Sequence, residues 1–163
     1  MIFTFFILFI ILLRISELVI SKNNEKWLLQ NNAVEYGRRH YPVIVALHVG
    51  FIVSLIIEYL IFLPVGLSLI FFIFYFALLV LKAWVIVSLG KFWNTRIYHI
   101  ASIPLVKKGP YRFCKHPNYL VVIAEIAVIP LIFHLYYTAI VFTVLDGIVL
   151  LIRIKEENKA LAL

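Results

Sequence analysis

The segment with the most side chains suited to chemistry is GPYRFCKHPNYL, Gly109–Leu120. It combines basic residues, a histidine, an asparagine and two tyrosines with two prolines. These groups supply hydrogen-bond donors and flat aromatic faces, which suit a polar, partly anionic, partly flat ligand. Pro110 and Pro117 fix the backbone at both ends, and Gly109 permits a tight turn. A basic loop that binds lipid phosphate is an equally open interpretation.

A second cluster, RIKEENKAL, covers Arg153–Leu161 near the C-terminus. On a helix, Arg153, Glu156 and Glu157 are spaced i, i+3 and i+4, so all three can face one site. A solvated helix end with ion pairs among its own residues is the alternative.

The composition indicates that both clusters belong to a membrane protein. Apolar residues make up 64% of the 163 residues and charged residues 14%, against about 25% charged in typical soluble domains. The ranges Tyr59–Leu81 and Ile126–Leu145 carry no charge, and about 20 apolar residues suffice to cross a bilayer. Ile2–Ile20 lacks a basic start and a small-residue cleavage site, so we expect a retained span and not a signal peptide.

The pattern predicts an all-α, polytopic integral membrane protein with five transmembrane helices in a single domain, residues 1–163. The expected spans are about residues 2–20, 42–62, 66–90, 119–135 and 137–154. The last two form a helical hairpin, because Tyr119–Ile152 as one helix would measure about 51 Å, against a hydrocarbon core of roughly 30 Å. We expect the turn near Phe133–Tyr137.

The basic residues predict the orientation. With five spans, all of the 15 Lys and Arg residues except Arg14 and Lys82 fall on one side. Short cytoplasmic loops collect Lys and Arg, so the N-terminus is expected outside and the C-terminus in the cytosol. The net charge of +7 then reflects anionic lipid headgroups, and we expect no nucleic-acid partner because no basic helix or stacking platform is present.

Several charged side chains fall inside the predicted spans, at a similar depth in the cytosolic half. They are Arg14, Glu17, Lys82, Glu125 and Asp146, while Glu58 lies near the outer face. Such residues usually face a protein interior or a wet cavity, and their shared depth predicts a polar cavity that opens to the cytosol. Alternatively each is structural, with Arg14 paired to Glu17, Lys82 extended to the surface, and the two acids hydrogen-bonded in packing.

No metal site is predicted. Cys114 is the single cysteine, which allows no internal disulfide and no cysteine metal site. The remaining histidines are scattered and are expected to be packing or interfacial residues; they are His40, His48, His99 and His134. Aromatic residues near the span ends are expected to be interfacial anchors without chemistry; they are Trp27, Tyr41, Trp93, Tyr98, Tyr136 and Tyr137.

Together the two clusters resemble the isoprenylcysteine carboxyl methyltransferase family, integral membrane enzymes that methylate with S-adenosylmethionine. GPYRFCKHPNY resembles a pattern of Gly-x-Tyr followed by Arg/Lys-His-Pro-x-Tyr, and RIKEENKAL resembles Arg-x-x-x-Glu-Glu-x-x-Leu. SLGKFWNTRI is similar to the interfacial stretch before the first motif, so the detailed resemblance runs from Lys91 onward. The short tail after Glu157 is similar to the bacterial branch, whose members resemble alkylpyrone O-methyltransferases. A bacterial cell membrane is therefore the expected location.

The resemblance implies roles for individual residues. Those that would hold S-adenosylmethionine, and S-adenosylhomocysteine as product, are Tyr111, His116, Pro117, Asn118, Tyr119 and Glu156. Arg153 would orient the oxyanion of the acceptor, and Glu157 would act beside it. Which of Glu156 and Glu157 contacts the ribose or amino group of the cofactor stays open. The lipophilic acceptor would extend between spans into the polar cavity at Arg14, Lys82, Glu125 and Asp146. No glycine-rich dinucleotide fingerprint is present.

The resemblance implies methyl transfer to a carboxylate or acidic enol of an isoprenylcysteine-like or alkylpyrone-like acceptor. Such a group is already ionised near neutral pH and needs no general base. A phospholipid or amine N-methyltransferase, with His116 as base, is the alternative within this chemistry. An NADPH-dependent membrane reductase and a non-enzymatic membrane partner protein are alternatives of another class. The sequence leaves the acceptor and the oligomeric state open.

Overall fold

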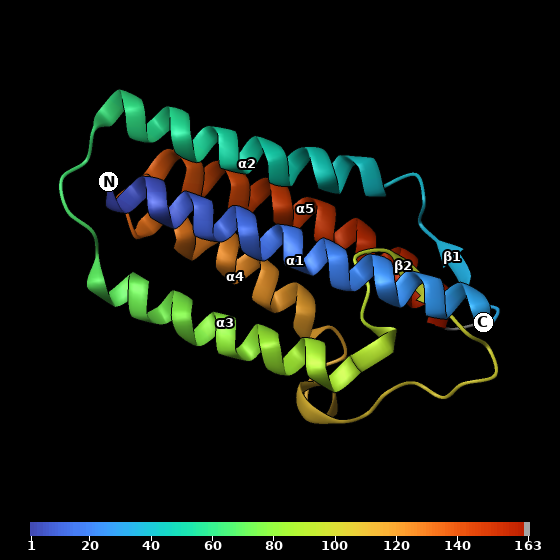
Figure 1. The fold of residues 1–163 in the computed structure, drawn as a ribbon. Coiled ribbons are helices and arrows are strands. Elements are labelled where there is room, and N and C mark those ends of the chain that lie inside the picture. Colours follow the sequence, from blue (N-terminus) through green and yellow to red (C-terminus); the bar gives the residue numbers. More distant parts are fainter. Residues whose placement is uncertain (162–163) are drawn as a thin grey trace.

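The structure, a computed structural model, describes residues 1–161 and contains five α-helices with two short strands (Figure 1). The helices are α1 Ile2–Gln30, α2 Tyr41–Phe62, α3 Leu69–Leu89, α4 Pro117–Leu131 and α5 Tyr136–Leu161. The strands are β1 Val34–Tyr36 and β2 Ile97–His99, and two 3-10 turns cover Gly90–Phe92 and Gly109–Arg112.

Successive helices run in alternating directions along one bundle axis (Figure 1). The C-terminal ends of α1, α3 and α5 therefore lie at the same end as the N-terminal ends of α2 and α4. We call this the loop end, because both strands and the long connection from β2 to α4 lie there. The topology thus brings the two motif segments to one end of the molecule.

Four helices are long and apolar enough to cross a bilayer, namely α1, α2, α3 and α5. The protein is accordingly an integral membrane protein. The fifth helix, α4, has 15 residues and measures about 22 Å, which is shorter than a hydrocarbon core of roughly 30 Å. Helix α1 continues to Gln30, past the expected span end at residue 20, and carries its last turns beyond the apolar stretch.

The C-terminal helical hairpin is present, and its turn covers residues 132–135. Helix α4 begins at Pro117, whose missing N–H costs nothing at the first helical position. At the turn, His134 adopts a left-handed φ of 58°, and the Leu135 N–H donates to the Pro130 carbonyl at 3.0 Å. The α5 N-terminus is capped by Glu58 of α2, which accepts from the backbone N–H groups of Tyr137 (3.0 Å) and Thr138 (2.7 Å).

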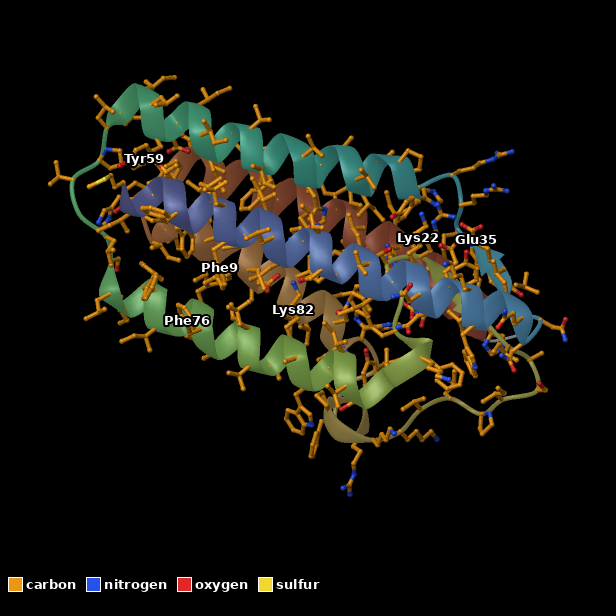
Figure 2. All side chains as sticks on the ribbon, viewed as in Figure 1. Phe9, Lys22, Glu35, Tyr59, Phe76 and Lys82 are labelled. Carbon is orange, nitrogen blue, oxygen red and sulfur yellow. The ribbon has the colours of Figure 1, made fainter. Side chains whose placement is uncertain are left out.

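Aromatic packing fills the bundle at the end opposite the loops. Phe3 of α1 stacks on Tyr59 of α2 with 3.7 Å between ring centroids, and Phe133 meets Phe3 edge-on at 5.1 Å. Figure 2 shows Tyr59 in this region, and Phe9 opposite Phe76 between α1 and α3. Rings at these distances add specific attraction to their burial. This end is therefore closed, and the cavities described below lie toward the loop end.

The fold is almost entirely helical, as the sequence predicts, and one small β-sheet is added to the helices. Strands β1 and β2 pair antiparallel, with Val34, Glu35 and Tyr36 opposite His99, Tyr98 and Ile97. Each strand has three residues, too few for a period-two pattern to stand out in the sequence. The pairing ties the α1–α2 connection to the segment that precedes the first motif.

Candidate active site

The two motif segments meet at the loop end through turns that the sequence makes possible. Gly109 has a φ of 57°, and a Cβ at this position would clash with the side chain of Ser88 on α3. The following 3-10 turn contains the buried Pro110, and the chain then reaches His116 at the N-cap of α4. The last turns of α5 pass beside this point, which places Glu157 next to His116.

Four side chains of the two motifs form a continuous chain of polar contacts. Arg153 Nε donates to the Tyr119 hydroxyl at 2.8 Å, and that hydroxyl donates to Glu157 Oε2 at 2.5 Å. His116 Nδ1 lies 3.3 Å from the same carboxylate oxygen, and its ring stacks on Tyr119 at 5.5 Å. Arg153 is also fixed by donating to the Thr95 carbonyl at 2.6 Å. These contacts orient all four side chains before any ligand binds.

The charge of Glu157 shapes the titration of its neighbours outside the membrane-spanning segments. Its hydrogen bond to the imidazole raises the pKa of His116 above the ordinary 6.5, more than partial burial lowers it. Burial, and then the same carboxylate, raise the pKa of the Tyr111 hydroxyl well above its usual value. Tyr111 is therefore neutral across the physiological range, and His116 gains positive charge more readily than a free histidine.

Beside this chain of contacts lies a cavity of about 660 Å³, which we call the loop cavity. Its wall includes most of the predicted cofactor residues, together with residues of the preceding segment and the connection to α4. The motif residues include Tyr111, His116, Asn118, Tyr119, Arg153 and Glu157, and the others include Leu28, Trp93, Asn94, Arg96, Tyr98, Ile100, Leu105 and Lys107. A volume of this size is in the range of small-molecule sites, roughly 300–1,000 Å³.

A second cavity of about 220 Å³ lies between the helices, and we call it the helix cavity. It includes the predicted pocket residues Arg14, Lys82 and Asp146, together with Glu17, Tyr41, His48, Val45, Val49 and Leu18. The two cavities share a wall, formed by Trp93, Asn94, Asn118, Tyr119 and Arg153. The first motif and the end of α5 therefore separate a cavity at the loop end from one inside the bundle.

The charged residues within the helices pair with one another beside the helix cavity. Lys82 Nζ lies 2.5 Å from Glu17 and 2.7 Å from Glu125, and Arg14 lies 2.9 Å from Glu17 and 3.0 Å from Glu125. Lys82 does not extend to the surface; it is 5% exposed and points from α3 toward α1 (Figure 2). Glu125 is buried behind the cavity wall, at 1% exposure. Arg14 and Glu17 thus pair as the structural interpretation expects, Lys82 is buried and not extended, and the cavity that these residues line is mostly apolar.

Two of the predicted cofactor residues do not line the loop cavity. Glu156 is turned toward Gly37 and His40, where it lines a small separate pocket, and its carboxylate pairs with Lys159 at 2.8 Å. Pro117 is buried at the start of α4 and sets the helix direction without facing the cavity. Of the three residues expected to share one face of α5, Arg153 and Glu157 line the loop cavity, whereas Glu156 shares only the small pocket with Arg153.

The segment Trp93–Tyr98 lines the cavities at positions that the residue types alone did not reveal. Trp93 was expected to be a membrane anchor, yet it is 3% exposed, lines both cavities, and donates to Asn118 Oδ1 at 3.3 Å. The sequence pointed to this segment only through the resemblance of SLGKFWNTRI to the interfacial stretch that precedes the first motif in the family. That resemblance assigned no role to individual residues of the segment.

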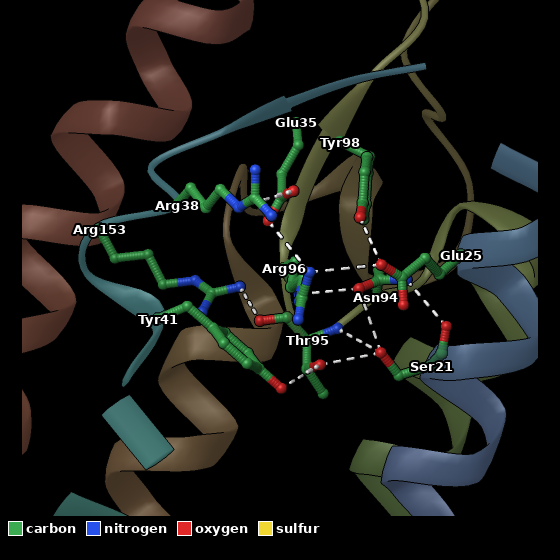
Figure 3. A network of polar contacts seen from close by, with 10 residues as sticks. All are labelled: Ser21, Glu25, Glu35, Arg38, Tyr41, Asn94, Thr95, Arg96, Tyr98 and Arg153. Atoms are coloured by element: carbon green, nitrogen blue, oxygen red, sulfur yellow. Dashed lines mark hydrogen bonds and ion pairs between the residues drawn. The ribbon is translucent and has the colours of Figure 1, made fainter. Parts of the chain in front are cut away.

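A network of polar contacts holds this segment in place (Figure 3). Ser21 of α1 contacts Asn94 at 3.1 Å and Thr95 at 2.8 Å, and Tyr98 donates to Glu25 at 2.6 Å. The bond to Glu25 adds to burial in raising the pKa of Tyr98 to about 12. Figure 3 shows Arg153 reaching the backbone of Thr95 beside this network. Helix α1 thereby positions the segment that includes Thr95, whose carbonyl accepts the hydrogen bond from Arg153.

Comparison with known proteins agrees with the class that this geometry indicates, a helical membrane enzyme with a polar site at one end. The model of the isoprenylcysteine carboxyl methyltransferase (ICMT) family matches residues 69–163. The chain belongs to this family.

Two bacterial relatives match nearly the whole chain. The uncharacterized protein YpbQ of Bacillus subtilis is 38% identical over 165 residues, which cover 98% of this chain and 96% of that protein. An uncharacterized protein of Haemophilus influenzae is 29% identical over 161 residues, which cover 94% and 91%. No solved structure matches the chain.

Proposed function

We propose that this protein is an S-adenosylmethionine-dependent O-methyltransferase that acts on a lipophilic acceptor with a carboxylate or acidic enol. Family membership supports methyl transfer. The observation that carries the assignment of the two ligands is the shared wall at Tyr119, Asn118 and Arg153, with one cavity at the loop end and the other among apolar helices. A water-soluble donor and a membrane-dissolved acceptor would meet at that wall.

The residues of the loop cavity fit the cofactor. Glu157 offers a carboxylate, Asn118 an amide, and Trp93 and Tyr111 flat aromatic faces, which match the ammonium, hydroxyl and adenine groups of S-adenosylmethionine. Basic residues on the same wall, including Arg96 and Lys107, match its carboxylate. When bound, the cofactor supplies a methyl carbon activated by a sulfonium leaving group. We assign the acidic contact to Glu157, because Glu156 faces elsewhere.

The helix cavity fits an acceptor that arrives from the bilayer. Three of its lining residues, Leu18 on α1 and Val45 and Val49 on α2, are 43–57% exposed on the outside of the bundle. The cavity therefore borders the lipid between α1 and α2. An apolar tail can leave the bilayer at this point without crossing water, which keeps its transfer free energy small.

Arg153 is placed to position the acceptor's anionic group. It lies on the shared wall, 8% exposed, with Nε on Tyr119 and one terminal nitrogen on Thr95. The remaining guanidinium donors can orient a carboxylate or enolate. Because that group is already ionised, the work of the protein is alignment and exclusion of water, which can lower a barrier by several kcal/mol.

We also propose that the loop end faces the cytosol, where S-adenosylmethionine is made available to a bacterial enzyme. The concentration of basic residues in the connections at this end supports that orientation. It places the N-terminus outside and the C-terminus inside, with α4 and α5 as the last two crossings. A cysteine-labelling experiment on intact cells, with single cysteines at Val65 and Lys107, tests the orientation. Labelling of the Lys107 position by an impermeant reagent would contradict it.

Transfer of a labelled methyl group tests the proposed activity. Purified protein is incubated with methyl-labelled S-adenosylmethionine and a lipid extract of bacterial membranes, and lipid-soluble label is counted. His116→Ala and Glu157→Gln are expected to abolish transfer, whereas the neighbouring Glu156→Gln, whose side chain faces away, is the matched control and should keep it. Hydrolysis identifies the class of product, because a carboxyl ester releases labelled methanol in alkali, a methyl enol ether releases it in acid, and an N-methyl group releases it in neither. Equal loss in Glu156→Gln, or no loss in the other two, would contradict the assignment.

A further inference from the structure

Asp146 is a buried acid that nothing in the proposed transfer step uses. It lies on α5 at 1% exposure and lines the helix cavity. Its Oδ2 atom is buried without a hydrogen-bond partner, and within residues 1–161 its carboxylate takes part in no ion pair. Buried polar groups in membranes are costly unless they serve a ligand or a partner.

The charged groups that the other helices contribute around the helix cavity are already engaged. Arg14 contacts Glu17 and Glu125, and Lys82 contacts the same two carboxylates. On α2, His48 Nδ1 is bonded to the Ile44 carbonyl at 2.9 Å. Arg14, Lys82, Glu17 and Glu125 therefore balance one another, and Arg153, the third cation that lines the cavity, lies two turns from Asp146 and donates to Tyr119 and Thr95. Asp146 is left as an acceptor that faces the cavity with no donor of its own.

The spacing of Asp146 and Arg153 along α5 defines the distance between the two groups of a ligand that would contact them. Both residues lie on α5 and both line the helix cavity. They are seven positions apart, which is about two helical turns on one face, or roughly 10 Å along the axis. A ligand whose anionic group meets Arg153 and whose body extends into the helix cavity passes Asp146 at about that distance.

We propose that Asp146 determines specificity by accepting a hydrogen bond from a hydroxyl group on the apolar body of the acceptor, roughly 10 Å from the oxygen that is methylated. This inference rests on the proposed function, because it treats the helix cavity as the acceptor site. A hydroxyl fits better than an ammonium, because the acceptor comes from the bilayer and a neutral donor is far less costly to carry there. The acceptor is thus a hydroxylated lipidic acid or enol and not a plain hydrocarbon chain.

Equilibrium binding of fatty acids tests this contact without requiring turnover. Labelled stearate is bound to purified protein in detergent micelles and displaced by stearate or by hydroxystearates that differ in the position of the hydroxyl. The wild type should prefer a mid-chain isomer to stearate by about tenfold, the value of one net hydrogen bond. Isomers with the hydroxyl close to the carboxylate or to the methyl end should bind no more tightly than stearate. This comparison within the wild type is informative even if a variant fails to fold.

Variants test whether Asp146 is the residue that causes the preference for the mid-chain hydroxystearate. Asp146→Leu should bind stearate and the mid-chain hydroxystearate equally, and Asp146→Asn, which retains an oxygen acceptor, should keep part of the preference. Thr143→Val is the matched control, because it removes a buried unpartnered hydroxyl one turn away on α5 that does not line the cavity. It should leave the tenfold preference unchanged.

Several outcomes would overturn the proposal: no preference in the wild type, an unchanged preference in Asp146→Leu, or no binding of any of these fatty acids. Binding of S-adenosylhomocysteine, measured on the same samples, is a separate readout and should be equal in the wild type and Asp146→Leu. If the wild type did not bind S-adenosylhomocysteine but retained the hydroxyl preference, the proposed function would fail while the Asp146 contact would stand.

Discussion

Tyr119→Phe removes a single oxygen atom from the centre of the site. In the structure this hydroxyl accepts from Arg153 Nε at 2.8 Å and donates to Glu157 at 2.5 Å. The phenylalanine ring keeps the aromatic surface and the stacking against His116. The change therefore tests the hydroxyl bridge and leaves packing almost untouched.

The size of the effect follows from the two bonds. Hydrogen bonds to charged groups contribute about 1.5–3 kcal/mol each. Without the bridge, Arg153 and Glu157 are one turn apart on the same helix and can pair directly, which returns about 0.3–0.5 kcal/mol, and water can enter from the loop cavity. We therefore expect a net loss of about 2 kcal/mol in cofactor binding, or roughly 30-fold in Kd.

Calorimetric titration of the purified protein with S-adenosylhomocysteine measures this change. Tyr111→Phe is the matched control, since Tyr111 lines the same cavity and its hydroxyl forms no side-chain hydrogen bond in the part of the chain that the structure describes. It should bind within about threefold of wild type. If Tyr119→Phe also bound within threefold, the hydroxyl bridge would not organise the cofactor site.

Three further results are expected. Arg153→Lys should raise the acceptor KM at least tenfold, because lysine lacks the planar fork that grips an oxyanion while bonded to Thr95, and should weaken S-adenosylhomocysteine binding less than Tyr119→Phe does, because the Tyr119–Glu157 bond remains; a loss of cofactor binding as large as the loss for the acceptor would contradict its role. Gly109→Ala should lower the free energy of unfolding by about 1–2 kcal/mol, because φ is 57° and its Cβ would clash with Ser88; an unchanged Tm would contradict this. Because Glu157 raises the pKa of His116, their contact stabilises the fold fully below pH 6.5, and this stabilisation is lost as pH rises through the folded pKa. The difference in free energy of unfolding between wild type and His116→Gln should therefore shrink as pH rises, and a difference that grew would contradict the pairing.

The sequence predicts much of the architecture because hydrophobic length is a strong signal. Uninterrupted apolar stretches identify the long helices, and the excess length of Tyr119–Ile152 requires the hairpin that the structure contains. The number of membrane crossings stays a prediction, since α4 has only 15 residues. The three-residue strands lie below what periodicity can detect.

Within the site, sequence spacing predicts which residues share a helix face but not how that helix is rotated. Arg153, Glu156 and Glu157 were all compatible with one site, yet only a rotation fixed by packing decides that Glu156 turns toward Lys159 and His40. Trp93 shows a second limit. Its residue type and its position in the sequence suit an interfacial anchor, and only the tertiary contact with Asn118 makes it part of a cavity wall.

The sequence predicts that several charged residues lie at a similar depth inside the helices, and the structure shows that they pair with one another. Arg14 and Glu17 form the expected i, i+3 contact, but their bonds to Glu125 and Lys82 join segments that are remote in the chain. Contacts of that kind follow from how three helices pack, and no single helix encodes them. The buried position of Lys82 is the clearest example.

Ultraviolet crosslinking of methyl-labelled S-adenosylmethionine to the purified protein, followed by peptide mapping, tests most directly that the two motif segments form one cofactor cavity. The label should appear on peptides that contain Tyr111–Tyr119 or Arg153–Glu157, and excess S-adenosylhomocysteine, but not NADPH, should remove it. Absence of label, or label confined to the aromatic end of the bundle around Phe3 and Tyr59, would contradict the account.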